Sequence, residues 1–186
     1  MLLNVTKVNQ QIRKSHQLFW GRKDGQDIVC NGYWLIKANL SKTEYRKILG
    51  LLVEKLGIMP KEQELLAYRR NYKTKEFETT VDPKGDRFDL FLDIPKTKVE
   101  DTELIEKTET GQIIDARIFK GNEYIYINRN YMDMISRNGL LEYFSKGYLN
   151  PIYAVDMLTN EFLMVLPIRM PECNKHLKEI EPITAK

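Results

Sequence analysis

The segment YINRNYMDMI at residues 126–135 decides the fold, because it runs from an expected strand directly into an expected helix. Upstream, residues 112–119 and 124–127 are expected to be strands joined by a Gly-Asn turn. A helix is expected from Arg129 to about Arg137. Strand pairs interrupted by isolated helices are typical of the α+β class.

The same mixture of strands and isolated helices continues outward from this segment. Beyond it we expect a second short helix at residues 140–145, strands at 152–156 and 162–166, and a polar tail at 171–186. Before it, residues 76–81 and 87–94 alternate charged and apolar side chains with the period of a strand. At ~150 residues per domain, the 186 residues favour one domain with an elaboration.

The N-terminal part is expected to begin with a strand at residues 2–5 and a short amphipathic helix. Val8 and Ile12 recur at the i, i+4 spacing of that helix, which ends near His16. Glycine-containing turns then separate three further strands. These strands are expected at residues 17–20, 27–30 and 33–37.

The clearest helix start is Ser-Lys-Thr-Glu at residues 41–44, a capping box whose hydroxyl and carboxylate satisfy free backbone N–H groups. An apolar stripe follows as far as Leu56, and Gly57 supplies the C-terminal stop. Pro60 is expected to open a second helix at residues 61–69. The interval at about residues 41–80 is therefore predicted to contain a helical hairpin.

Composition is that of a soluble globular protein, with 42% hydrophobic and 30% charged residues. No apolar run approaches the ~20 residues that span a bilayer, and the N-terminus lacks the features of a signal peptide. We therefore expect a cytoplasmic protein without a membrane partner.

Positive charge is concentrated at the start of the chain. Residues 1–50 contain nine Lys or Arg against three Asp or Glu, although the whole chain has a net charge of only +3. This asymmetry is compatible with contact to nucleic-acid phosphates, and equally with an ordinary solvated surface.

The sequence does not indicate a metal or cofactor site. Two cysteines, Cys30 and Cys173, and two histidines, His16 and His176, lack the spacing of a zinc site. Glycine-rich phosphate-binding motifs and the nucleophile elbow of hydrolases are also missing. We therefore expect a protein that is not an enzyme and has no cofactor.

The best enzyme alternative is a metal-dependent nuclease that uses Asp86 or Asp89. On a strand rising ~3.3 Å per residue, Asp89 and Asp93 would lie about 13 Å apart, too far to share one Mg²⁺ ion. A solvent-facing row that alternates with core residues explains these aspartates better.

Residues 126–135 resemble the strand-to-helix segment of the bacterial DNA sliding clamp, the beta subunit of DNA polymerase III. Residues 164–170 (MVLPIRM) resemble the closing strand of a clamp domain, and residues 30–35 (CNGYWL) are similar to its Thr-Asp-Gly-His-Arg-Leu strand. The resemblance covers about residues 1–38 and 85–170. It implies one clamp-like α+β domain at residues 1–170, an insertion at about 41–80, and a C-terminal tail.

Clamps encircle duplex DNA with helices that present Lys and Arg to phosphates, and they bind peptides of DNA-processing proteins in a surface groove. The resemblance implies no catalysis. The positions that match the DNA-contacting helices are Lys7, Arg13, Lys14, Arg129 and Arg137. Those that would approach the groove are Gly32, Tyr33, Leu35, Val165, Pro167, Ile168 and Arg169.

A basic-aromatic segment at residues 68–75 also carries a partner-binding expectation, for nucleic acid or an acidic protein. Its candidate residues are Arg69, Arg70, Tyr72 and Lys73. Trp20, Tyr33 and Trp34 could form a stacking surface, but their strand context favours packing in the core or at its rim.

A bacterial clamp subunit has three such domains, and its ring closes from six. A chain with one domain would need a six-fold homo-oligomer, or would form no ring. This departure suggests a phage or mobile-element protein that binds DNA or DNA-processing proteins. The alternative is a phage-encoded inhibitor of a host nucleic-acid machine, such as an anti-CRISPR-type counter-defence protein that targets a host nuclease effector.

Overall fold

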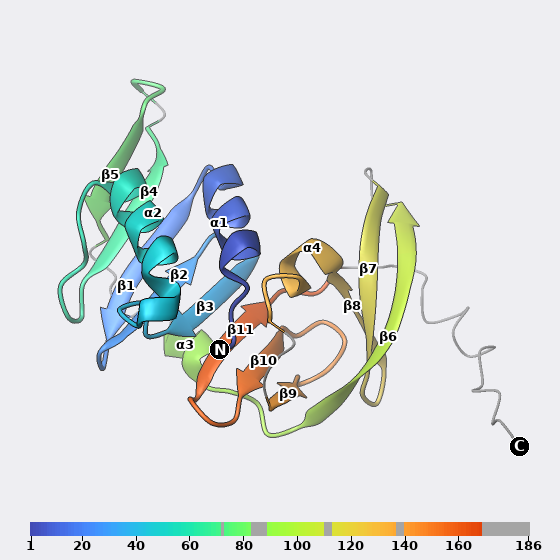
Figure 1. The fold of residues 1–186 in the computed structure, drawn as a ribbon. Coiled ribbons are helices and arrows are strands. Elements are labelled where there is room, and N and C mark those ends of the chain that lie inside the picture. The colour runs from blue at the N-terminus through green and yellow to red at the C-terminus, as the bar shows by residue number, and fades with distance from the viewer. Residues whose placement is uncertain (72, 83–88, 110–112, 137–139, 169–186) are drawn as a thin grey trace, which may run out of the picture.

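The computed structural model describes residues 1–71, 73–82, 89–109, 113–136 and 140–168. Their strands form one antiparallel eleven-stranded sheet in the order β5-β4-β1-β2-β3-β11-β10-β9-β6-β7-β8 (Figure 1). The strands are β1 (Leu18–Lys23), β2 (Gln26–Cys30), β3 (Trp34–Ala38), β4 (Leu65–Arg70), β5 (Phe77–Val81), β6 (Lys98–Glu109), β7 (Ile113–Lys120), β8 (Tyr124–Asn128), β9 (Leu141–Phe144), β10 (Ile152–Asp156) and β11 (Glu161–Val165). The helices are α1 (Val5–Lys14), η1 (Thr43–Tyr45), α2 (Arg46–Leu56), α3 (Asp89–Leu92) and α4 (Arg129–Met132). The chain is therefore a mixed fold that is largely sheet.

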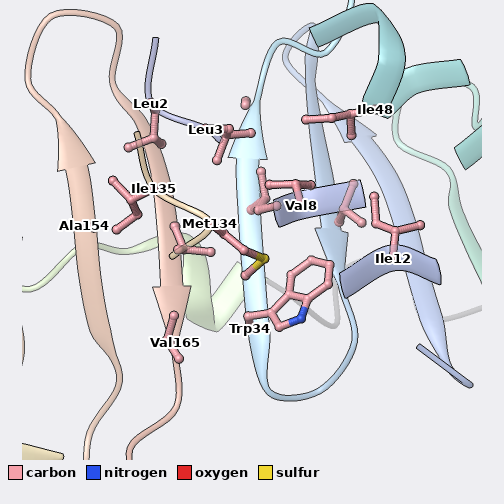
Figure 2. Packing of buried hydrophobic residues seen from close by; sticks show 14 of the residues in the cluster. Leu2, Leu3, Val8, Ile12, Trp34, Ile48, Met134, Ile135, Ala154 and Val165 are labelled. Carbon is pink, nitrogen blue, oxygen red and sulfur yellow. The ribbon is translucent and has the colours of Figure 1, made fainter. Parts of the chain in front are cut away.

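Helices α1, α2 and α4 bury their apolar residues in one cluster on the same face of the sheet. Val8 and Ile12 of α1 lie beside Trp34 of β3 in this cluster (Figure 2). A second buried cluster lies on the opposite face, where Leu35, Phe162 and Met164 pack together with the segment around Leu92. Helices α1, α2 and α4 thus cover one side of the sheet, which leaves their polar faces toward solvent.

Two units of similar connectivity meet at the centre of the sheet. In the first, a single bridge at Leu3 precedes α1 and strands β1, β2 and β3; in the second, β8 precedes α4 and strands β9, β10 and β11. Strands β3 and β11 pair, so the middle of the sheet has the order β1-β2-β3-β11-β10-β9. The N-terminal segment ties the units together, because Asn4 N donates to Met134 O (2.7 Å) and Ser136 N donates to Leu2 O (2.7 Å).

The interval at residues 41–80 is not a helical hairpin. Helix α2 is followed by the hairpin β4–β5, so the predicted helix at residues 61–69 is wrong. Leu66 packs into the cluster below the helices, whereas Leu65 and Ala67 face the other cluster. An apolar run that is buried on both faces of a sheet has no period that separates it from a helix.

The capping box at Ser41 does not form either. The first turn is the 3₁₀ helix η1, and no side chain caps it or α2. Instead, Tyr45 donates its hydroxyl to the buried carboxylate of Glu161 on β11 (3.0 Å), and Lys42 donates to the same carboxylate (2.6 Å). Gly57 does end α2 in the left-handed conformation, with φ of 81°.

Four other predicted elements differ from the structure. The strand at residues 2–5 is reduced to the bridge between Leu3 and Ile135, because α1 begins at Val5. Residues 89–92 of the predicted strand at 87–94 form α3, and residues 83–88 lie outside the described residues. The predicted helix at 140–145 is β9, which pairs with β10 and β6. Helix α4 stops at Met132, where a turn leads into the bridge at Ile135.

Candidate nucleic-acid interface

Helix α1 presents three cations on its solvent face. Asn4 caps its first turn by accepting a hydrogen bond from Lys7 N (3.3 Å), and Val8 and Ile12 are buried. The side chains of Lys7, Arg13 and Lys14 are exposed. Because α1 contains no Asp or Glu, no carboxylate within the helix neutralises these charges.

The end of α1 is held by a residue that the sequence did not single out. Lys55 of α2 donates to three backbone oxygens, those of Ile12 (2.9 Å), Arg13 (3.2 Å) and Ser15 (2.8 Å). A cation at the C-terminal end of a helix also interacts favourably with the helix dipole. Burial lowers the pKa of the Lys55 ammonium. Lys55 therefore fixes the turn from which Arg13 and Lys14 project.

Helix α4 lies next to α1. Gln11 Nε2 of α1 donates to Asn130 O of α4 at 3.5 Å, a long hydrogen bond. Arg129 is exposed and forms a distant ion pair with Asp115, at 3.9 Å. Three of the predicted cations are thus on α1 and Arg129 is on the neighbouring helix, whereas Arg137 lies outside the described residues.

A groove of about 640 Å³ opens beside the C-terminal end of α1. Its wall includes Tyr33 from the β2–β3 turn and Tyr131 from α4, whose rings stack with centroids 6.2 Å apart and planes 18° apart. We call it the tyrosine groove; Gln11, Lys14, His16 and Asn31 also line it. Burial and the nearby Tyr33 raise the pKa of Tyr131, so its hydroxyl stays protonated at neutral pH.

The turn that carries Tyr33 is held from three sides. Gly32 has φ of 94°, a conformation that favours glycine. Asn31 Oδ1 accepts from Tyr33 N (2.9 Å) and Trp34 N (3.2 Å), and Asn31 Nδ2 donates to Ser15 Oγ (3.2 Å). Leu166 N donates to Tyr33 O (2.9 Å). The backbone of Tyr33 is therefore fixed while its side chain is 61% exposed.

Of the other groove residues implied by the clamp resemblance, some lie at the surface and some are buried in the core. Leu35 and Val165 are completely buried, so their side chains cannot contact a partner, and that part of the prediction is corrected. They are buried because strands β3 and β11 lie in the middle of the sheet. Pro167 and Ile168 are partly exposed, and Ile168 N donates to Tyr126 O (2.8 Å). Arg169 lies outside the described residues.

The basic-aromatic segment is part of the β4–β5 hairpin, which projects beyond the neighbouring strands (Figure 1). Arg69, Arg70 and Lys73 are exposed, and Tyr72 lies outside the described residues. Arg70 Nε donates to Lys75 O (2.8 Å) across the hairpin. The hairpin also extends toward the groove through a row of stacked rings. In this row, Tyr68 stacks on Phe77 with centroids 5.2 Å apart, and Phe77 stacks on His16 at 6.1 Å.

The remaining candidates are the proposed stacking surface and the aspartates of the nuclease alternative. Trp20 and Trp34 are buried, as their strand context predicted, and Tyr33 lies at the rim. Asp89 is on α3 and forms an ion pair with Lys23 (2.9 Å), while Asp86 lies outside the described residues. Among the residues that the structure describes, no group of three or more His, Cys, Asp or Glu side chains could hold a metal ion.

Comparison of the chain with protein-family models, with curated proteins and with solved structures finds no match. Within the described part of the chain, no helix has the length and apolar character to cross a membrane.

Proposed function

We propose that this chain is a non-enzymatic, sliding-clamp-like protein of a phage or mobile element that binds DNA through its helix-bearing face. The observation that carries this proposal is the placement of α1 and α4. Both helices pack on the same side of the sheet, adjoin through Gln11 and Asn130, and present Lys7, Arg13, Lys14 and Arg129.

The two units of the sheet support the clamp-like part of the proposal. Each unit places a helix before three antiparallel strands, and the strands β3 and β11 join the units edge to edge. A clamp-like domain of this kind uses its helices to contact phosphates, and α2 adds the exposed cations Arg46 and Lys47 on the same face. The remainder of 41–80, the β4–β5 hairpin, extends the sheet beyond β1 as an insertion would.

Lys and Arg side chains that meet phosphates bind DNA without reading its sequence. The test is the anisotropy of two labelled duplexes of unrelated sequence, titrated with the protein between about 50 and 200 mM salt. We expect equal affinity for both duplexes and a linear fall of log affinity with log salt, with a slope of about −0.9 for each phosphate neutralised. Affinity that is independent of salt, or confined to one sequence, would contradict the proposal.

A ring around DNA requires six copies of a one-domain subunit. The molar mass in solution, measured by light scattering at micromolar protein and again with duplex present, decides this part of the proposal. A monomer or dimer under both conditions excludes an encircling ring but leaves binding to one side of the duplex intact.

The β4–β5 hairpin favours a second candidate function, inhibition of a host nucleic-acid machine. Its cations Arg69 and Lys73 are exposed, and the hairpin extends beyond the neighbouring strands (Figure 1), so a negatively charged protein surface could meet them. If this candidate is correct, Arg69→Glu weakens binding to a purified host nuclease effector, and Lys107→Glu, a reversal on β6, does not. Equal binding by both variants rejects the hairpin as the inhibitory surface.

A further inference from the structure

The tyrosine groove is not needed for contact with duplex phosphates, yet it gathers the exposed aromatic rings of this end of the sheet. Two sets of stacked rings contribute to it. Tyr33 and Tyr131, which both line the groove, form one set. In the other set, His16 lines the groove and stacks on Phe77, which stacks in turn on Tyr68 of the hairpin. The planes of neighbouring rings differ by at most 22°, so both sets present flat apolar surfaces.

One ring of each set is open to solvent despite its apolar face. Tyr33 is 61% exposed and Phe77 is 43% exposed. Most large aromatic side chains of a domain are buried to gain the hydrophobic free energy, as Trp20 and Trp34 are here. Rings that remain exposed next to a groove are therefore available to stack on a flat ligand.

The charge of the groove restricts which ligand fits. None of its described lining residues is Asp or Glu, and Lys14 is among them. Arg13 precedes Lys14 at the end of α1, and Arg70 lies opposite Phe77 in the register of the hairpin. The described lining thus carries a positive charge and no negative one, while the amides of Gln11 and Gln17 in the wall offer hydrogen-bond donors and acceptors.

The groove is also built before any ligand arrives. The bonds from Asn31 and Leu166 fix the backbone of Tyr33, and the capping bonds of Lys55 fix the end of α1 that carries Lys14. Preformed sites lose less conformational entropy on binding than flexible loops do.

Flat rings, cations and polar amides together match unpaired nucleobases linked by phosphates. Base pairs in a duplex stack on each other and do not offer their faces to a protein side chain. We propose that the tyrosine groove binds the unpaired bases of single-stranded DNA, with Tyr33 as the stacking platform. This inference extends the proposed DNA binding from the duplex to its single-stranded continuation, and Lys14 belongs to both surfaces.

The test compares three labelled probes at one salt concentration: a single strand of mixed sequence, the same strand with abasic sites throughout, and the matching duplex. The proteins are wild type, Tyr33→Ala, Tyr33→Phe and Tyr148→Ala. Tyr148 is a matched control because it is 40% exposed and does not line the groove. Circular dichroism checks that each variant is folded.

We expect Tyr33→Ala to bind the single strand roughly 5- to 150-fold more weakly, since stacking on one aromatic ring contributes about 1–3 kcal/mol per base. Tyr33→Phe keeps the ring and should stay close to wild type, as should Tyr148→Ala. The abasic strand should bind wild type and Tyr33→Ala equally, and the duplex should not distinguish them.

The outcomes separate this inference from the proposed duplex binding. If Tyr33→Ala binds the single strand as wild type does, or loses affinity equally for the abasic strand, the groove assignment is overturned and duplex binding is untouched. If the duplex does not bind but the single strand binds in a Tyr33-dependent manner, the duplex proposal fails and the groove assignment holds. No affinity of wild type for the single strand overturns the groove assignment.

Discussion

Asp27 on β2 is a buried carboxylate that joins two parts of the chain. Its Oδ1 accepts from Trp20 Nε1 (3.0 Å) and its Oδ2 accepts from Leu40 N (3.1 Å). Burial raises the pKa of Asp27 above its ordinary value of 3.8, even though both hydrogen bonds act to lower it. The folded state therefore holds the proton of Asp27 more tightly than the unfolded state does.

Because the pKa of Asp27 is raised in the folded state, we can predict how the stability difference between wild type and Asp27→Asn changes with pH. A raised carboxyl pKa stabilises the fold as pH falls, and its contribution is complete below the unfolded value of 3.8. The free energy of unfolding of wild type, minus that of Asp27→Asn, should increase as pH decreases from about 7 through the raised pKa. Urea denaturation of both proteins over this range measures the difference. A decrease on acidification would show that the two hydrogen bonds outweigh burial.

Lys55 makes a second prediction at the residue scale. Replacing it by Met removes three bonds to the end of α1 and the cation–π contact with Tyr68, at 5.2 Å. Hydrogen bonds to charged groups contribute about 1.5–3 kcal/mol, so Lys55→Met should lower the free energy of unfolding by about 2 kcal/mol. Lys47→Met, an exposed lysine on the same helix, is the control. Equal stability of the two variants would contradict the capping role.

Among the elements, the hairpin β6–β7 contains a buried ion pair between Arg117 and Asp101. It lies where a register shift interrupts the pairing of the two strands, between Asp101 and Ile105. Burial would lower the pKa of Arg117, but the hydrogen bond and charge of Asp101 raise it overall. The pairing with Asp101 therefore more than offsets the effect of burial on the Arg117 guanidinium, whose side chain is largely shielded from solvent.

Replacing one member of such a pair should lower the free energy of unfolding by more than replacing both members does. A buried charge left without its partner destabilises a protein by about 3–5 kcal/mol. We expect Arg117→Met alone to be more destabilising than Arg117→Met combined with Asp101→Leu. Thermal unfolding of both proteins and of Asp101→Leu completes the double-mutant cycle. Additive losses, with the double variant least stable, would mean that the pair does not couple β6 to β7.

The sequence predicted an element correctly when that element buries one face, because only then do apolar and polar residues recur with a recognisable period. Helix α1 buries one stripe, so Val8 and Ile12 revealed it. Strand β4 is buried on both faces, and Leu65, Leu66 and Ala67 therefore carried no period. Strand β9 was mistaken for a helix because its apolar residues also face both ways; Leu141 and Tyr143 pack on one cluster and Phe144 on the other.

The candidate site shows the same limit. The helical spacing around Lys7 and Lys14 predicted a polar face that carries them, and the clamp resemblance implied Tyr33 as a groove residue. His16 and Tyr131 enter the groove only because α1, the β2–β3 turn and α4 meet in space. Lys55 caps a helix that ends some forty residues earlier in the chain, and no local pattern announces such a contact.

At the scale of the whole molecule, exposed cations are concentrated on the helices. Helices α1, α2 and α4 carry the exposed cations Lys7, Arg13, Lys14, Arg46, Lys47 and Arg129. Strand β6, which lies toward the β8 edge of the sheet (Figure 1), carries the acidic residues Glu100, Glu103 and Glu106. The modest net charge of +3 therefore conceals an excess of exposed cations on the helices.

The most direct test of this account is the salt dependence of duplex binding by two triple variants of equal net charge. One is Lys7→Ala/Arg13→Ala/Lys14→Ala on α1, and the other is Lys96→Ala/Lys107→Ala/Lys146→Ala, exposed lysines outside the helices. The account predicts that the α1 variant loses affinity and that its log–log salt slope becomes shallower by about 2–3, while the second variant keeps the wild-type slope. Equal slopes for both variants would contradict the assignment of the helix-bearing face as the DNA-binding surface.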